Sequence, residues 1–163
     1  MNGTPELNDL SVDQFRSLSC SYVRKAFFGL GAKVEFALAK NLDFVVRMPN
    51  GERWGVVYQC YRIFNHGLQR TFTVKNQSDL QRICSANELI PVFACTVATS
   101  DEPNKIQVII TKLADLFSIV NNGSICWLRY SDKHGIVLRF NLNKDYLKEI
   151  KSNPDILYVV YTL

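Results

Sequence analysis

The pattern of apolar and polar residues divides the start of the chain into a helix and a strand. Apolar positions over residues 11–30 follow helical spacing, and either Ser11 or Asp13 can cap the start of that helix. Apolar and polar residues alternate over 33–38, which predicts a half-buried strand. The polar residues 1–10 are expected to be a flexible lead before the helix.

Most of the remaining pattern is typical of strands. Two β-rich runs within Asn41–Arg62 flank a Pro-Asn-Gly turn at residues 49–51 and predict a hairpin. The continuous apolar run PVFACTVA at 91–98 predicts a central strand buried on both faces. Further strands are expected at 71–74, 105–111, 125–130, 136–140 and 156–162, and further helices at 78–89, 113–119 and 143–152. These elements predict one α/β domain over residues 1–163.

Composition narrows the class of protein. The 163 residues include 47% apolar and 21% charged residues, enough to bury the core of one ordinary domain. The sequence has no apolar run of about 18 residues, and its polar start lacks the features of a secretory leader. The five cysteines are scattered without a CxxC pair, as is typical of free thiols in a reducing compartment. We therefore expect a cytoplasmic protein with no membrane segment.

The charge is mildly basic. A net charge of +4 is compatible with a phosphate-backbone partner without being diagnostic of one. Basic residues cluster in sequence near the ends of the first helix and after the hairpin, and in the fold they could line a groove for phosphates: Arg16, Arg24, Lys25, Arg62, Arg70 and Lys75. The other interpretation of any one of them is a solvated surface residue.

The hairpin carries candidate chemistry whose geometry depends on its turn. A two-residue turn at Asn50 and Gly51 would pair Asp43 with Tyr58 and put Gln59 on the other face of the sheet. A three- or five-residue loop, with Gly51 left-handed, would place Asp43 directly opposite Gln59. In that second register the carboxylate and the amide oxygen are candidate ligands for Mg²⁺.

From residue 11 to about residue 116 the chain resembles the PD-(D/E)xK, or restriction-endonuclease-like, nucleases, and its layout is close to that of Holliday junction resolvases. Their pattern is a helix, a strand, a strand bearing Asp, a turn, a strand ending in Glu or Gln, any residue and Lys, then a helix and a buried strand. Here LDFVV at 42–46 resembles the Asp strand and WGVVYQCY at 54–61 the closing strand. The resemblance implies a restriction-endonuclease-like core over 11–119, with a central mixed sheet flanked by helices, and a C-terminal hairpin, helix and strand extension over 120–163.

The resemblance also implies Mg²⁺-dependent hydrolysis of DNA, with a degenerate site. Asp43 and Gln59 would hold the metal together with the backbone carbonyl of Cys60, and Tyr61 stands at the position of the catalytic Lys. A phenol with a reference pKa of about 10 is neutral at pH 7 and cannot replace an ammonium charge. The acid that many resolvase-like members carry on the first helix is also missing, because residues 19–21 read Ser-Cys-Ser.

These features lead to two hypotheses from different classes. The first is a nuclease-fold protein that acts on or binds DNA with a weakened phosphodiesterase site, for which Arg47 or Lys40 would be a migrated cation. The second is a catalytically inactive structural or protein-interaction subunit of a larger assembly. The apolar terminal strand at 156–163 offers an edge that can pair between chains, so a homodimer or larger homo-oligomer is expected.

Overall fold

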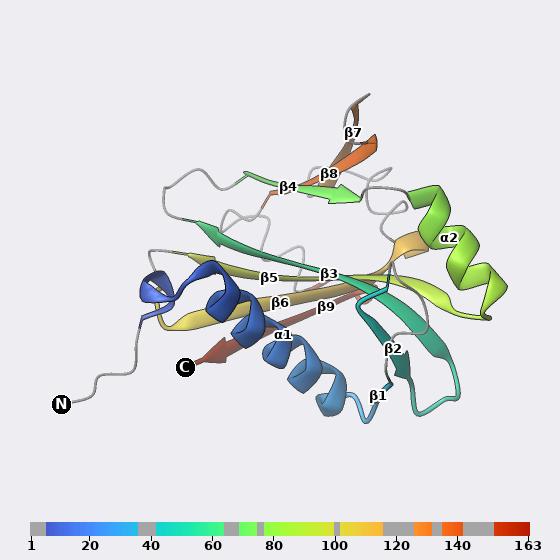
Figure 1. Ribbon diagram of the computed structural model, residues 1–163, viewed down its shortest axis with the longest axis horizontal. Helices are drawn as coiled ribbons and strands as arrows, with labels where there is room; N and C mark the ends of the chain where they lie inside the picture. The colour runs from blue at the N-terminus through green and yellow to red at the C-terminus, as the bar shows by residue number, and fades with distance from the viewer. Residues whose placement is uncertain are drawn as a thin grey trace.

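The computed structural model contains a six-stranded mixed sheet with a long helix across one face (Figure 1). The structure describes residues 6–35, 42–63, 69–74, 77–99, 102–115, 126–131, 135–141 and 152–163. The helices are η1 (Leu7–Asp9), α1 (Val12–Gly29) and α2 (Gln77–Ala86), and residues 113–115 are also helical. The strands are β1 (Lys33–Glu35), β2 (Phe44–Arg47), β3 (Arg53–Ile63), β4 (Gln69–Val74), β5 (Ile90–Thr99), β6 (Lys105–Lys112), β7 (Cys126–Ser131), β8 (Gly135–Asn141) and β9 (Ile156–Thr162).

The strands form two sheets. The larger has the order β1-β2-β3-β5-β6-β9, in which β3 and β5 are parallel and the other neighbours are antiparallel. The smaller has the order β4-β8-β7 and lies above the larger sheet in Figure 1. The predicted α/β class with a mixed sheet and helices is confirmed. The second sheet was not anticipated, because its β4–β8 pairing joins segments that are far apart in the sequence.

Helix α1 begins where the sequence places its cap. The Gln14 N–H donates to the Ser11 hydroxyl over 3.2 Å, and the Ser11 N–H donates to the Gln14 side chain over 2.9 Å. This reciprocal pair satisfies two N–H groups at the helix start. The helix ends at Gly29, so the predicted helix over 11–30 is confirmed to within a residue at each end.

The main core lies between α1 and one face of the large sheet. Val23 and Phe27 of α1 are fully buried there against Val46 and Val56. Helix α2 approaches the other face, because a Cβ on Gly55 would lie 2.7 Å from the Cys84 Sγ. The central strand β5 is buried continuously over residues 92–98, as its apolar run predicts.

Residues 6–10, which were expected to belong to a flexible lead, have a defined structure. Leu7 is fully buried in a second cluster with Phe15 and Ile106, and its N–H donates to the Pro103 carbonyl over 3.3 Å. The ordered part of the domain therefore includes Leu7, within the expected lead over 1–10.

Most other predicted elements are also found. The helix expected at 78–89 occurs as α2, the last hairpin as β7 and β8, and the terminal strand over 156–162 as β9. The parts of the predicted elements at 36–38, 116–119 and 143–151 lie outside the described residues. Four cysteines, Cys20, Cys60, Cys84 and Cys95, are free thiols. Within the described ranges, none of the helices has the length and apolar character needed to cross a membrane.

Candidate functional site

The turn between β2 and β3 is a three-residue loop. The Met48 N–H donates to the Glu52 carbonyl over 2.8 Å, which closes the loop around residues 49–51. Gly51 has a φ of +89°, in the left-handed region that favours glycine. Of the two alternatives that the sequence left open, the structure therefore has the longer loop, with three residues and Gly51 left-handed.

The pairing of β2 with β3 differs from both expected registers. Phe44 pairs with Val56, so the next position along the ladder sets Asp43 against Val57. The prediction that this loop brings Asp43 directly opposite Gln59 is wrong. The loop shifts the pairing by one residue, but in the opposite direction to the one that the prediction required.

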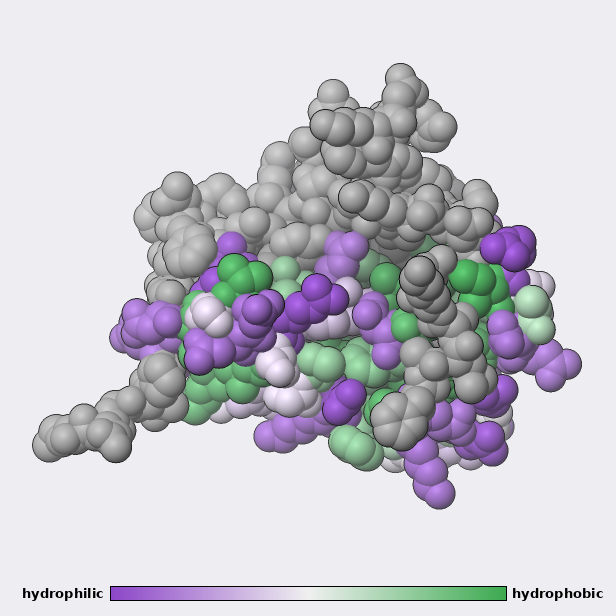
Figure 2. Space-filling model, viewed as in Figure 1, coloured by the Kyte–Doolittle hydropathy of each residue, from purple (hydrophilic) through white to green (hydrophobic). Residues whose placement is uncertain are grey.

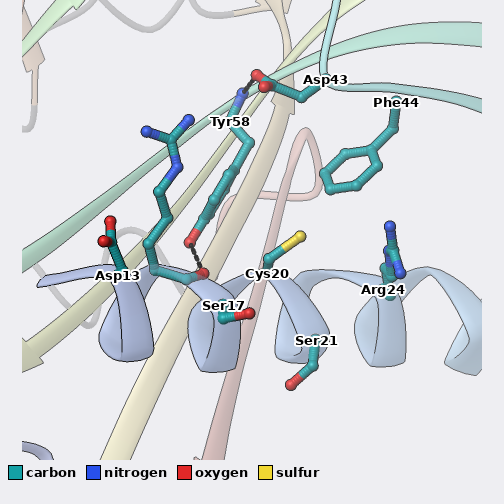
Figure 3. Close-up of a pocket in the computed structure, with 9 residues that line it drawn as sticks. Asp13, Ser17, Cys20, Ser21, Arg24, Asp43, Phe44 and Tyr58 are labelled. Carbon is teal, nitrogen blue, oxygen red and sulfur yellow. Dashed lines mark hydrogen bonds between the residues drawn. The ribbon is translucent and has the colours of Figure 1, made fainter. Parts of the chain in front are cut away.

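Asp43 joins the two strands where β2 begins. Its Oδ2 accepts the backbone N–H of Tyr58 at 2.8 Å, and its own N–H donates to the Val56 carbonyl at 2.9 Å (Figure 3). One residue before β2 begins, the carboxylate thus supplies the acceptor for an N–H of β3 in place of a backbone carbonyl. This is a structural role for Asp43 at the edge of β3, and the exposed side chain also borders a cleft.

The structural role of Asp43 can be separated from a catalytic one by a pair of variants. Asp43→Ala leaves the Tyr58 N–H without its acceptor and should lower the free energy of unfolding by about 1–2 kcal/mol. Asp43→Asn keeps an acceptor oxygen, so its unfolding free energy should stay within about 0.5 kcal/mol of the wild type. Urea denaturation of the three proteins measures both values. Equal losses of unfolding free energy in the two variants would show that the charge of Asp43, and not its hydrogen bond, stabilises the junction of β2 with β3.

A cleft of about 590 Å³ opens between α1 and the start of β2. Its lining residues are Asp13, Arg16, Ser17, Cys20, Ser21, Arg24, Asp43, Phe44 and Tyr58. Arg16, Cys20 and Arg24 recur every four residues, so they share one face of the helix. In Figure 3 the Cys20 sulfur and the Arg24 side chain extend from α1 toward the strands, and in Figure 2 hydrophilic side chains cover much of the surface over α1. The volume is that of a typical ligand pocket.

The cleft is lined by both charged and neutral side chains. The guanidinium carbon of Arg24 lies 5.4 Å from the centre of the Phe44 ring, a cation–π contact that holds the side chain over the strand. Burial raises the pKa of the Cys20 thiol, and it raises the pKa of the Tyr58 phenol well above its usual range. The Tyr58 hydroxyl donates to the Arg16 carbonyl at 3.3 Å. At neutral pH the thiol and the phenol are therefore uncharged, and the charges of the cleft belong to its arginines and aspartates.

The predicted site residues of β3 do not share one surface. Tyr58 is buried in the core on the α1 side and Cys60 packs against the same core. Alternation along the strand therefore puts Gln59 on the opposite face. Tyr61 pairs with Val97 of β5, and its side chain lies outside the described part of the structure. Tyr58 and Cys20, rather than Gln59, are the residues that line the cleft with Asp43.

Of the basic residues expected to contact nucleic acid, Arg16 and Arg24 border the cleft. Lys25 lies on another side of α1, with its Nζ 5.0 Å from the centre of the Tyr161 ring. Arg62 donates to the Leu7 and Leu10 carbonyls at 3.2 and 2.5 Å, and so ties β3 to the segment before α1. The basic residues grouped by sequence therefore separate into two cleft residues, a flanking surface residue and a structural residue.

Of the other basic residues considered for the site, one forms an ion pair and three have side chains outside the described part of the structure. The Nε of Arg47 lies 3.1 Å from a Glu35 carboxylate oxygen, in an ion pair on the hairpin. Arg70 belongs to β4, but its side chain lies outside the described residues, as do Lys75 and Lys40. The Arg47 side chain therefore already has an acidic partner on β1, Glu35.

Neither a metal site in the described part of the chain nor a relative identifies the function of this site. Among the described residues, no group of three or more His, Cys, Asp and Glu side chains is placed to hold a metal ion. Binding of Mg²⁺ by Asp43, Gln59 and the Cys60 carbonyl stays a prediction. No protein-family model, curated protein or solved structure matches this chain. The cleft and the order of the structural elements are therefore the observations that bear on function.

Proposed function

We propose that this chain is a restriction-endonuclease-like domain that binds DNA in the cleft between α1 and β2–β3 and has lost efficient cleavage. The order of the described elements supports the fold part of this proposal. A helix, a strand, a strand preceded by Asp43, a turn and a third strand are followed by α2 and the buried strand β5. Strand β4 is an addition to that layout, inserted between β3 and α2.

The observation that carries DNA binding is the pair of arginines along the cleft. Arg16 and Arg24 are both exposed and lie on one face of α1, two helical steps of four residues apart. Eight residues of helix rise about 12 Å, which matches about three to four base-pair steps along the axis of duplex DNA at about 3.4 Å each. A guanidinium group presents paired donors that fit phosphate oxygens. The two side chains can therefore contact phosphates of one strand at separate points.

The polar groups that metal-dependent cleavage needs are weakened in three places. The Asp43 carboxylate accepts the Tyr58 N–H, so one of its oxygens already has a structural partner. Cys20 on α1 borders the cleft where resolvase-like proteins carry an acid, and its raised pKa leaves it neutral. Tyr61 takes the position of the catalytic lysine, and Arg47 is paired with Glu35. These features of the site support a protein that binds DNA without strong catalysis.

Binding and cleavage can be measured on the same DNA. Fluorescence anisotropy with a short duplex and a branched DNA should show binding that weakens steeply as salt is raised, because phosphate contacts release counterions. Supercoiled plasmid incubated with Mg²⁺ or Mn²⁺ should remain intact. Nicking that needs the metal and is lost in Asp43→Asn would show a working nuclease. Absence of binding at low salt would favour the protein-interaction subunit.

Alkylation of Cys20 tests whether DNA occupies the cleft. Because the raised pKa of this thiol keeps its thiolate scarce at pH 7, its labelling should speed up as the pH is raised. At mildly alkaline pH, bound DNA should slow its labelling, as read by mass spectrometry of the α1 peptide. Cys20→Ser provides the blank for that peptide. Unchanged labelling in the presence of saturating DNA would place the binding surface elsewhere.

A further inference from the structure

A second pocket, of about 380 Å³, lies where α1 ends, beside the β2–β3 hairpin and one end of the β6–β9 ladder. Seven of its eleven lining residues are apolar, and none of the eleven lines the cleft. They are Leu30, Met48, Trp54, Ile110, Thr111, Lys112, Asp115, Pro154, Asp155, Ile156 and Leu157. A mostly apolar lining with a few polar groups is typical of a pocket that binds a small organic molecule.

The hairpin supplies an aromatic wall whose position is fixed. The Trp54 indole N–H donates to a Glu52 carboxylate oxygen over 2.9 Å, and the edge of the Trp54 ring meets Phe27 of the core. The Lys112 Nζ lies 5.5 Å from the centre of the Trp54 ring and 3.6 Å from the same Glu52 oxygen. Because this ammonium group already has an acidic partner, the Lys112–Glu52 pair adds little net charge to the pocket.

Two carboxylates give the pocket its remaining charge. Thr111 pairs with Ile156 on the β6–β9 ladder, and its hydroxyl donates to the Asp155 carbonyl over 3.3 Å. Asp155 therefore lies at the end of the ladder where β6 leads into Asp115. Among the ion pairs formed by the described residues, none includes either carboxylate. The pocket is thus locally acidic in a chain whose net charge is +4.

The end of α1 adds to this negative potential. The helix ends at Gly29 with no basic residue in its last turn, and Leu30, its C-cap residue, lines the pocket. The carbonyl end of a helix carries a partial negative charge, which favours a cation nearby. An apolar pocket beside two carboxylates and a helix C-terminus is complementary to a positively charged group attached to an apolar body.

We propose that this pocket binds a small organic cation, a primary amine carried on an aromatic or short aliphatic body. The ammonium group pairs with Asp115 and Asp155, and the apolar body lies against Met48, Trp54 and Ile110. A bare metal ion suits the pocket less well, because most of the lining residues offer no oxygen ligand. The inference concerns a site separate from the cleft and does not depend on DNA binding.

A titration with 2-phenylethylamine, followed by NMR, tests the site and the charge together. The amine should shift the Trp54 indole N–H signal, which Trp127→Phe assigns because the chain has two tryptophans. The neutral analogue 2-phenylethanol has the same shape, and it should bind at least about tenfold more weakly because it lacks the charge-assisted contact. The anion 3-phenylpropionate should leave the Trp54 signal unchanged.

Exchanging the two carboxylates for amides tests the assigned residues. Asp115→Asn/Asp155→Asn keeps the side-chain shape and should weaken binding of the amine at least about tenfold. The matched control, Asp9→Asn/Glu88→Gln, removes two negative charges from exposed residues outside the pocket and should keep the wild-type affinity. Circular dichroism checks that both variants are folded.

Three results would overturn the proposal. The first is an unchanged Trp54 signal in about 10 mM amine, a concentration at which even millimolar binding is detected. The second is an alcohol that binds as tightly as the amine. The third is a wild-type affinity in Asp115→Asn/Asp155→Asn, or an equal loss in the control variant, because either would show that the two carboxylates of the pocket do not hold the ammonium group.

Discussion

Phe27→Ala should lower the free energy of unfolding by about 3–5 kcal/mol, the range found for buried aromatic residues. Phe27 is fully buried between α1 and the sheet. Its ring meets the Trp54 ring edge-on, with centroids 6.2 Å apart and planes inclined by 75°. Alanine would leave a cavity at the junction that holds α1 against β3, and it would also remove the aromatic pair. Urea denaturation followed by circular dichroism measures the loss.

The next residue in the chain supplies the control. Phe28 has the same side chain on the same helix turn but is 62% exposed. Phe28→Ala should change the unfolding free energy by no more than about 0.5 kcal/mol. Similar losses in the two variants would mean that helix propensity or residual structure in the unfolded chain, and not burial under α1, controls the stability. A large loss in Phe27→Ala alone would show that this packing fixes the helix that carries the cleft arginines.

The elements that the sequence predicts well are those with strong local signals. Helix α1 combines a reciprocal cap at Ser11 with apolar residues at helical spacing, and both signals act within a few residues of each other. Strand β5 follows a continuous run that is rich in apolar and β-branched residues, the pattern of a strand buried on both faces. The β4–β8 pairing lacks such a signal, because it joins residues 69–74 to residues 135–141, which are far apart in the sequence.

The candidate site was harder to predict because it depends on a one-residue difference in register. The left-handed Gly51 was foreseeable from the Asn-Gly pair, but the direction in which the loop shifts the pairing was not. That direction decides that Asp43 bonds to the Tyr58 N–H instead of facing Gln59. The shared face of Arg16 and Arg24 on α1 could have been recognised from the sequence, since the two residues are two steps of four residues apart. That Tyr58 lines the cleft could not be predicted, because the sequence does not show which face of β3 packs against α1.

Arg16→Ala/Arg24→Ala should have the largest effect on DNA binding. If each guanidinium neutralises one phosphate, the double variant should reduce the slope of log affinity against log salt by about two. Affinity at low salt should fall at least about tenfold, because both contacts are electrostatic and lie along one face of the cleft. Both side chains are exposed, so the fold should be retained, apart from a loss of about 0.5–1 kcal/mol for the contact of Arg24 with Phe44. Anisotropy titrations at several salt concentrations measure the slope.

The matched control is Lys33→Ala/Arg82→Ala. It also lowers the net charge of +4 by two, but at other positions. Lys33 lies on β1 and Arg82 on α2, and neither residue lines the cleft. Binding driven by the overall charge of the molecule would weaken equally in the two double variants, which would contradict a role for the cleft. A fall in slope that is confined to Arg16→Ala/Arg24→Ala would assign the phosphate contacts to the face of α1 beside Asp43. Retention of the wild-type slope in both variants would move the binding surface to another part of the chain.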